Sequence, residues 1–565
     1  MRLIEIRLLD GPSVYRPEPV VKVEVAIGRR RSWYGPRVPA RHLLVRLGAA
    51  IPRRDWPEPV ATLTGWAARL RREHGEGTGG IRVHRSSDPG HWIATWPWSG
   101  AERARLIAEA AASLSDRSAT PARRARLTGT QEKLLAGWED RIAGASATPP
   151  PWVRDVDRRI PIVSISGTNG KSTTTRLITR ILLRAGRRVG TTTSDGILVD
   201  ERMVEPGDWT GPGGAKEILE RSDVDVAVLE TARGGILLRG IGVLHNDVAI
   251  VTNVSEDHLG LHGIQTIDQL AEVKASVTRI TRPDGWDVLN ADDPRVLSMR
   301  RVATGRPWLC SLDPWHPAIR DALAEGGRAT VPLDGWMTVL DGSTSRPLLE
   351  LMDVPVTIAG ISRHNVMNAM QAASAAIGIG LPERAVVKGL TTFVTDPERN
   401  PGRANLFELD GRVVVVDYAH NEAGMLGLTE ICAGLRRSGG EIWLVICAAG
   451  DRTDQILHAF AYRAARGSDH LAIAELLRYL RGRAREETVQ RLVAGARDGG
   501  AEEIDVYADE LSGLRGVLAR SRKRDVIGVT ALGMRPEVFA WLDGAGATRM
   551  TAARVRRVVR SARGS

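Results

Sequence analysis

The sequence predicts an α/β protein with several domains: a small N-terminal α+β domain, a doubly wound parallel-sheet domain, and a second α/β domain. Its 565 residues are 43% hydrophobic and 26% charged, an ordinary globular composition that leaves room for roughly three to four domains. Beyond residue 155, short apolar runs end in Gly, Ser, Thr or Asn and are separated by helix-length segments. Strands buried on both faces of a parallel sheet have this pattern.

Residues 1–115 alternate strand-like pieces with amphipathic stretches, which predicts the small α+β domain. The expected strands are 20–28, 42–49 and 91–98, and the expected helices are 60–75 and 101–114. In 91–98 (HWIATWPW) the alternation favours a half-buried strand over a platform on which nucleic acid bases could stack. Residues 116–155 are expected to form a helical and Pro-rich linker, because three consecutive prolines in SATPPPW cannot continue a helix.

Residues 156–399 and 400–546 are expected to form the two larger domains. The first contains the apolar runs IPIVSISG, VDVAVLET and DVAIVTNVS. The second, Rossmann-like in its alternation, contains RVVVVDYAHN, EIWLVICAAGDR, HLAIAE, EIDVYAD and DVIGVTALG. For the basic segment 547–565, a frayed and solvated tail is favoured over a last short helix.

Composition excludes several classes of protein. No stretch approaches the ~18 apolar residues of a membrane helix, and the charged start MRLIEIRLLDGP does not fit a signal peptide, so we expect a soluble cytoplasmic protein. Cys310, Cys432 and Cys447 are scattered and are expected to be buried, reduced side chains. The net charge of +11 comes from 71 Arg and 7 Lys against 67 acidic residues, an imbalance typical of coding bias, so nucleic acid is not the expected partner.

The segment ISGTNGKSTTTRLITRILLRAG (165–186) leads from a strand through a Gly-rich turn into a helix. Gly167 and Gly170 permit a nest of backbone N–H groups around a β-phosphate, Lys171 can neutralise the phosphates, and Ser172 can ligate Mg²⁺. Ile165 stands where the usual phosphate-binding motif has its first Gly. The segment therefore predicts an ATP site, and the alternative is a Gly-rich turn without a ligand.

Eight motifs in order resemble those of the Mur ligase superfamily of ATP-dependent amide ligases, over about residues 156–540. They are SGTNGKSTTT, LETARGG, TNVSEDHLG, AEVKAS, SRHNVMNAMQAA, NPGR, VDYAHN and AAGDR. Within the superfamily the sequence is similar to the cyanophycin synthetase family, through DGPSVYRPEPVVKVEV, ETARGGILLRG and ELLRYLRGRAREE. The ATP-grasp domain that lies between these two parts in that family has no room here, because only about 45 residues separate them.

The resemblance implies that ATP phosphorylates a carboxylate and that an amine then attacks the acyl phosphate. It assigns catalysis to Lys171, Glu230, His258, Lys274 and Arg403. It assigns nucleotide contacts to Gly167, Thr168, Asn169, Gly170, Lys171, Ser172, Thr173, Asn365, Asn368, Asp417, His420 and Arg452. Chemistry of this kind needs positioning and cationic clamping more than an acid–base pair.

The expected Mg²⁺ ligands are Ser172, Glu230 and His258. Glu230 and His258 follow apolar runs, where strand ends meet the crevice of an open α/β sheet. A structural role for His258 is the alternative that its motif argues against. The neighbouring Glu256 and Asp257 are not expected to act as a carboxylate pair, because adjacent residues of an extended chain point in opposite directions.

The family resemblance implies a carbamylated lysine at Lys274, since in several members this modification turns the cation into an oxygen ligand. The alternative is an unmodified lysine on a helix surface near Glu272. Asn365 and Asn368 are three residues apart and are expected to share one helix face, with a helix cap as the alternative.

The expected function is an ATP-dependent amide ligase that joins arginine or lysine to a β-aspartyl acceptor, an acidic polymer or peptide. A partner ligase would supply that acceptor, and the chain itself is not expected to build a polymer from free aspartate and arginine. The alternatives are a Mur-type ligase for another acceptor, such as a cell-wall precursor, a folate or a polyglutamate, and a non-catalytic polymer-binding partner.

Overall fold

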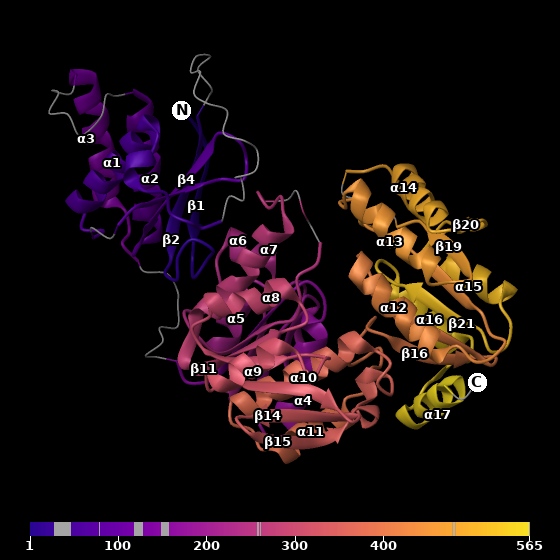
Figure 1. The fold of residues 1–565 in the computed structure, drawn as a ribbon. Coiled ribbons are helices and arrows are strands. Elements are labelled where there is room, and N and C mark those ends of the chain that lie inside the picture. Colours follow the sequence, from indigo (N-terminus) through magenta and orange to yellow (C-terminus); the bar gives the residue numbers. More distant parts are fainter. Residues whose placement is uncertain are drawn as a thin grey trace.

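The computed structural model describes most of the chain (Figure 1). The described residues are 1–27, 47–77, 80–117, 128–148, 158–256, 259, 262–476, 478–480 and 482–563. They form three sheets, of four, eleven and seven strands. This confirms the α/β fold class, with an N-terminal α+β unit before two larger α/β units.

The N-terminal sheet has the strand order β1-β2-β4-β3 and is antiparallel throughout. Its strands are β1 (Arg2–Leu9), β2 (Val20–Ala26), β3 (Arg82–Arg85) and β4 (His91–Pro97), and its helices are α1 (Glu58–Glu73), α2 (Ala101–Arg117) and α3 (Gly129–Gly144). Helices and sheet share one core around the fully buried Trp66 and Trp96. The strand expected at 91–98 is therefore confirmed, but it is not half-buried: four consecutive residues, 93–96, are buried, because β4 lies inside the sheet between β2 and β3.

The other N-terminal expectations were met in part. The strand expected at 20–28 and both helices are present, whereas most of 42–49 lies outside the described residues. Strand β1 was not predicted, and only its last residue, Leu9, is fully buried. In the linker, Leu135 and Ile142 of α3 are buried in the N-terminal core, and residues 149–157, around the expected boundary, lie outside the described residues.

The eleven-stranded central sheet has the order β15-β14-β13-β12-β11-β10-β5-β9-β6-β7-β8. Its strands are β5 (Ile162–Ser166), β6 (Val189–Thr192), β7 (Gly196–Val199), β8 (Arg202–Pro206), β9 (Val226–Glu230), β10 (Asn246–Val251), β11 (Thr281–Asn290), β12 (Arg306–Cys310), β13 (Arg328–Leu333), β14 (Trp336–Asp341) and β15 (Thr344–Glu350). The seven strands from β13 to β6 are parallel, as the apolar runs predict. Antiparallel hairpins extend both edges.

Helices cover both faces of the central sheet, so it is doubly wound. On one face lie α4 (Lys171–Arg184), α10 (Arg363–Gly378) and α11 (Glu383–Thr392). On the other lie α5 (Pro212–Leu219), α6 (Arg233–Leu238), α7 (Ile267–Lys274), α8 (Pro294–Ser298) and α9 (Pro317–Ala324). Figure 1 shows α4, α10 and α11 beside β14 and β15, and α5, α6, α7 and α8 nearer the N-terminal unit.

The C-terminal sheet has the order β20-β19-β18-β21-β17-β16-β22. Its strands are β16 (Asn405–Leu409), β17 (Arg412–Asp417), β18 (Ile442–Ile446), β19 (His470–Ala474), β20 (Ile504–Tyr507), β21 (Val526–Thr530) and β22 (Thr548–Arg549). All five predicted strands, β17 to β21, are parallel. Helices α12 (Glu422–Leu435), α13 (Asp454–Arg466), α14 (Arg485–Asp498) and α17 (Ala552–Arg563) cover one face, and α15 (Glu510–Arg520) and α16 (Arg535–Gly544) the other.

The favoured interpretation of residues 547–565 as a solvated tail is wrong. The segment contains β22 and the twelve-residue helix α17. Val555, Val558 and Val559 of α17 are buried in the core that α12 shares. These valines recur at helical spacing, and burying that stripe outweighs the repulsion among the arginines on the outer face.

The N-terminal unit docks against the central one beside α6. Asp10 accepts two hydrogen bonds from the Arg239 guanidinium, at 2.9 and 2.7 Å. The backbone reinforces this contact, because the Asp10 amide donates to the Arg239 carbonyl and the Ile241 amide to the Pro12 carbonyl, each at 2.7 Å. Val14 joins the core of the central unit.

Two composition-based expectations can be compared with the fold. Cys310, Cys432 and Cys447 are free and buried, as expected. Across the described ranges, we find no helix with the length and apolar character needed to span a bilayer.

Candidate active site

The candidate site lies at the carboxyl edge of the central sheet. Strands β10, β5, β9 and β6 are parallel neighbours, so the segments that follow them meet at this edge. The phosphate-binding loop (P-loop, residues 167–172) follows β5, and Glu230 ends β9. The sequence therefore placed these motifs at one edge correctly.

The P-loop contains two glycines, Gly167 and Gly170, that no other residue can replace without strain. Gly170 has φ +88° directly before α4, and an added Cβ would lie 2.4 Å from the Asn368 Oδ1. A Cβ on Gly167 would lie 1.9 Å from the Thr252 Oγ1. The Lys171 Nζ folds back and donates to the Thr168 carbonyl at 2.9 Å. A lysine beside the N-terminus of α4 suits a phosphate, so the loop fits ATP.

Two of the three predicted metal ligands meet in the structure. The buried Ser172 hydroxyl donates to the Glu230 Oε2 at 2.9 Å, and the Glu230 side chain is buried as well. A hydroxyl and a carboxylate at this distance are the hard oxygen donors that Mg²⁺ takes, so this pair fits the ion. His258 and Asp257 lie outside the described residues, and Glu256 is exposed.

The segment after β10 holds the P-loop from the side. Asn253 accepts the Asn169 amide N–H through Oδ1 at 3.0 Å and donates its Nδ2 to the Asn169 carbonyl at 2.9 Å. The Thr252 hydroxyl donates to the same carbonyl at 2.6 Å. Thr168 exchanges hydrogen bonds with the Ser255 backbone. The sequence analysis did not single out Thr252, Asn253 or Ser255, although all three lie in the TNVSEDHLG motif.

Lys274 lies under the P-loop. It is the last residue of α7 and is only 4% exposed, and its Nζ donates to the Gly167 carbonyl at 2.5 Å. The alternative of a lysine on a helix surface is therefore wrong. The contact with Gly167 connects Lys274 directly to the phosphate-binding segment.

Asn365 and Asn368 lie side by side on α10, as their spacing predicts. The Asn368 Nδ2 donates to the Asn365 Oδ1 at 3.0 Å, and both side chains are buried. The helix-cap alternative is wrong, because Ser362 occupies the N-cap position. Since Asn368 packs against Gly170, this pair lies beside the P-loop.

The C-terminal unit reaches the P-loop through Asn421. Asn169 and Asn421 exchange two side-chain hydrogen bonds of 3.1 Å across 252 residues of sequence. Asn421 also caps α12 by accepting from the Gly424 amide at 2.9 Å. The sequence quoted Asn421 within VDYAHN but assigned nucleotide contacts to Asp417 and His420 instead.

The other four predicted site residues of the C-terminal unit lie in different surroundings. Asp417 accepts the Ala404 amide at 2.8 Å, and the His420 Nδ1 lies 2.9 Å from the Tyr418 carbonyl. The Arg403 guanidinium lies over the Tyr418 ring, 4.6 Å from its centroid. Arg452 is buried in the loop that follows β18.

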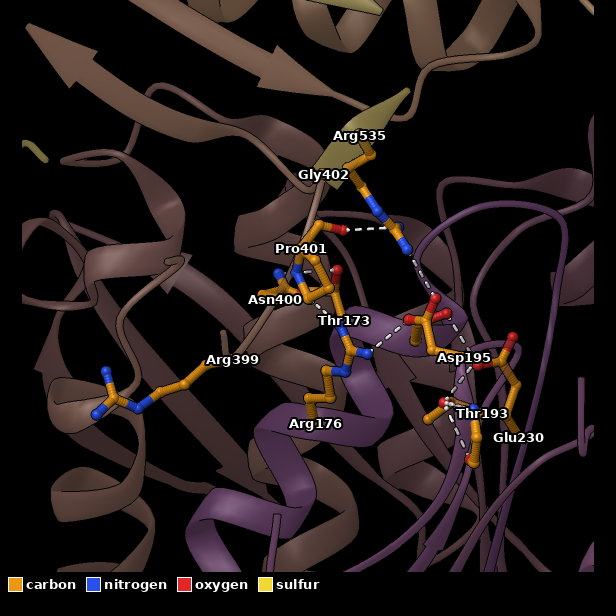
Figure 2. A network of polar contacts seen from close by, with 12 residues as sticks. Thr173, Arg176, Thr193, Asp195, Glu230, Arg399, Asn400, Pro401, Gly402 and Arg535 are labelled. Carbon is orange, nitrogen blue, oxygen red and sulfur yellow. Dashed lines mark hydrogen bonds and ion pairs between the residues drawn. The ribbon is translucent and has the colours of Figure 1, made fainter. Parts of the chain in front are cut away.

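A polar network joins α4 to the C-terminal unit (Figure 2). Asp195, in the turn after β6, accepts from Arg176 at 2.6 Å and from Arg535 at 3.1 Å. Arg176 also donates to the Asn400 side chain at 3.3 Å. The sequence analysis missed these residues; the position of Asp195 after a strand was the available signal, whereas Arg176 and Arg535 are two of 71 arginines.

Two family models match this chain. The Mur ligase middle domain matches residues 165–376, and the Mur ligase glutamate ligase domain matches residues 402–533. These ranges contain the P-loop and the unit that supplies Asn421 and Arg535. The two matches correspond to the second and third units of the fold.

Curated relatives match over the same region. The cyanophycin synthetase of Synechocystis sp. is 38% identical over 370 residues, 65% of this chain and 42% of the relative. That of Crocosphaera subtropica is 40% identical over 337 residues, 60% of this chain and 38% of the relative. The chain thus spans about two fifths of the length of these relatives.

A solved structure shows the same fold. E. coli FolC in complex with DHPP and ADP superposes with a TM-score of 0.52 at 17% identity, covering 86% of this chain and 99% of FolC. Together, the matched domains, the relatives and the P-loop geometry lead to one conclusion. The chain belongs to the Mur ligase family and is similar to the cyanophycin synthetases within it.

Proposed function

We propose that this chain is an ATP-dependent amide ligase that joins the amine of arginine or lysine to a β-aspartyl carboxylate. The observation that carries the proposal is the Ser172–Glu230 contact of 2.9 Å directly below a P-loop that Asn421 of the C-terminal unit touches. A phosphate cradle, a pair of metal ligands and a second domain over them are the parts that carboxylate activation needs.

The reaction would proceed in two steps. A carboxylate oxygen of the acceptor attacks the γ-phosphorus of ATP, so that ADP leaves and an acyl phosphate forms. The amine nitrogen then attacks the carbonyl carbon, phosphate leaves through a tetrahedral intermediate, and the nitrogen loses a proton. Both steps develop negative charge on phosphate oxygens, which cations stabilise in the transition state.

The residues on the P-loop are suited to these steps. The Lys171 ammonium, now on the Thr168 carbonyl, can turn toward the phosphates. Ser172 and Glu230 would hold Mg²⁺, which when bound would neutralise charge on the transferring phosphate. Lys274, if it is carbamylated, would offer anionic oxygens beside Gly167; as an ammonium it would support the loop through the contact it already makes.

An acidic acceptor fits the charge of the protein. The chain carries a net charge of +11, and its curated relatives in Synechocystis and Crocosphaera are cyanophycin synthetases. We propose an acceptor that is an acidic polymer or peptide made elsewhere, with a partner ligase as its source. A positive protein concentrates such an anion by long-range attraction.

The experiment is ADP release measured with a panel of amino acids, with and without a primer of aspartate and arginine joined through β-carboxylates. We expect release that depends on both the primer and arginine or lysine, and no polymer from free aspartate and arginine. Release that depends on a folate or a cell-wall precursor instead would replace the acceptor and keep the ligase class. Absence of ATP turnover with every combination would overturn the ligase proposal.

A further inference from the structure

One carboxylate in the structure binds arginines from two domains. The Asp195 Oδ2 accepts from the Arg176 Nη2 at 2.6 Å, and its Oδ1 accepts from the Arg535 Nη2 at 3.1 Å. Arg176 belongs to α4, the helix that begins in the P-loop, whereas Arg535 is the first residue of α16 in the C-terminal unit. Figure 2 shows Asp195 between the two guanidiniums.

The same two arginines also hold the chain segment that joins the domains. Arg176 donates to the Asn400 Oδ1 at 3.3 Å, and the Asn400 Nδ2 donates to the Thr173 hydroxyl of α4 at 3.4 Å. Arg535 donates through Nη1 to the Pro401 carbonyl at 3.1 Å. Asp195 therefore lies at the centre of a network that includes α4, the junction and α16.

The Arg535 end of the network is held by a buried group. The loop before Arg535 is held by Glu510, which is 1% exposed and accepts the amides of Leu532, Gly533 and Met534 at 2.6, 2.9 and 2.5 Å. Gly402 leaves room for the arginine itself, because a Cβ there would lie 2.8 Å from the Arg535 Cδ. These contacts restrain the backbone from which the Arg535 side chain extends toward Asp195.

Positive charges outnumber negative ones in the network around Asp195. Arg176, Arg535 and Arg403 all act on this one carboxylate. Burial raises the pKa of Asp195, but the attraction of these arginines outweighs it, so the pKa lies below its usual value. The negative charge of Asp195 now lies between Arg176 and Arg535 at the domain junction. If that charge were removed, the two guanidiniums would repel each other.

We infer that Asp195 is a positioning residue that docks the C-terminal domain on the P-loop helix. The docked arrangement is the one in which Asn421 reaches Asn169 of the P-loop. Docking can be measured without substrate, so this part of the inference does not depend on the proposed function. Only the expected effect on turnover rests on that function.

The test compares Asp195→Asn with a matched control in the full chain. Asp195→Asn keeps the shape and removes the charge. The control is Glu201→Gln, because Glu201 pairs with Arg180 of the same helix at 2.5 Å but lies wholly within the central domain. Dyes on Glu220→Cys and Glu503→Cys, at side chains 55% and 90% exposed, report the distance between the domains, and the three native cysteines are buried.

We expect Asp195→Asn to lower the ratio of docked to undocked molecules about tenfold, and Glu201→Gln to leave it unchanged. Arg535→Gln should lower the ratio as well, and the effect of the double variant should be smaller than the sum of the two single effects, because each single variant already removes the ion pair between Asp195 and Arg535. Unchanged energy transfer in Asp195→Asn, or additive effects in the double variant, would overturn the inference. If Asp195→Asn does not fold, the same measurement on Arg535→Gln tests the inference.

Turnover separates this inference from the proposed function. If the chain is a ligase, Asp195→Asn should lower kcat while the KM for ATP changes little, because the P-loop itself is intact. A fall in docking without any ligase activity in the wild-type chain would support the positioning role and refute the function. Ligase activity of the wild-type chain together with normal docking in Asp195→Asn would support the proposed function and refute the positioning role.

Discussion

Single side chains supply most of the charge at the candidate site, because the P-loop itself is built from backbone groups. Lys171, Glu230 and Lys274 are charged side chains beside the P-loop, and the last two are buried. Their contacts are with Thr168, Ser172 and Gly167 respectively, and only the pair of Glu230 and Ser172 was expected from the motifs. Lys171 is only partly buried, so substituting it removes a charge with little loss of packing.

Lys171→Ala should reduce ATP turnover by a factor of about several hundred and leave the fold intact, since it removes one cation from the transition state. ADP release and circular dichroism measure the two effects. Lys133→Ala is the matched control, because Lys133 is exposed on α3. Near-wild-type ADP production by Lys171→Ala would contradict the assignment of the P-loop.

Lys274→Ala should be nearly inactive and partly rescued by formate or acetate, because a small carboxylate can occupy the space of a carbamate beside Gly167. ADP release with and without the added carboxylate measures this. If an ammonium is what the site requires, methylamine should rescue and acetate should not, and the carbamate would be refuted. Full activity of Lys274→Ala would refute any catalytic role.

Asp287 predicts a dependence of stability on pH. It is buried in β11, and burial raises its pKa to about 7, although the Thr281 hydroxyl and the Gly305 amide act in the opposite direction. The pKa in the folded state thus exceeds the unfolded value of 3.8. The unfolded chain therefore loses this proton first, and the stabilisation present below about pH 4 is lost as pH rises through about 7.

Wild-type protein should thus lose stability between about pH 5 and pH 8.5 relative to Asp287→Asn, by up to about 3 kcal/mol, because about two pH units separate pH 5 from the folded pKa of about 7. Urea denaturation of both proteins at the two pH values measures the difference, and the asparagine variant serves as the control that does not titrate here. Parallel pH profiles of the two proteins would show that Asp287 is already ionised in the fold.

Among the elements, the turn between β5 and α4 matters most for the site. Gly170→Ala would force a side chain into a left-handed backbone at φ +88° and place a Cβ 2.4 Å from Asn368. We expect ATP affinity to fall at least about tenfold, since the strain displaces the loop amides. Isothermal titration calorimetry measures it. Gly137→Ala is the control, because Gly137 lies in α3 with nothing near its Cβ position. Equal affinity in both variants would contradict this role.

The charged helix α17 shows how an element can be misjudged from composition. Six of the residues from Ala552 to Arg563 are arginine or serine, which suggested a solvated segment. The deciding feature is instead the stripe of Val555, Val558 and Val559, which packs on the C-terminal core. Burial of three apolar side chains is worth roughly 1.5–3 kcal/mol each, more than exposed like charges cost on a helix surface.

For the whole molecule, we expect closure of the C-terminal domain on the central one as a required step. Asn169 and Asn421 already meet, but Asp417, His420 and Arg452 belong to the C-terminal domain, and in the function that we propose they contact the nucleotide bound at the P-loop. Closure also excludes water from an acyl phosphate. Small-angle scattering with a non-hydrolysable ATP analogue and an amino acid should show compaction.

Asn421→Ala provides the comparison for that measurement, because it removes the side-chain contact with Asn169, and with it the N-cap of α12, while the sequence of the central domain stays unchanged. We expect weaker compaction in this variant. A radius of gyration that stays constant in the wild-type protein when both ligands are added would refute the required closure.

The sequence by itself determined the α/β fold class, the parallel strands and the Gly-rich turn between β5 and α4. These follow from local patterns: an apolar run such as 162–166, a Gly-rich turn and a helix N-terminus lie within about twenty residues. It also determined that Glu230 and Ser172 share one edge, since parallel neighbours bring their carboxyl ends together.

Only the tertiary structure decided which side chains meet across the domains. Asp195 and Arg535 are 340 residues apart, and Asn169 and Asn421 are 252 apart. Their local sequence contains no sign of the partner, because one carboxylate among 67 acidic residues and one guanidinium among 71 look alike until the fold selects them. Local patterns specify elements, whereas a contact between elements depends on the free energy of packing the whole chain.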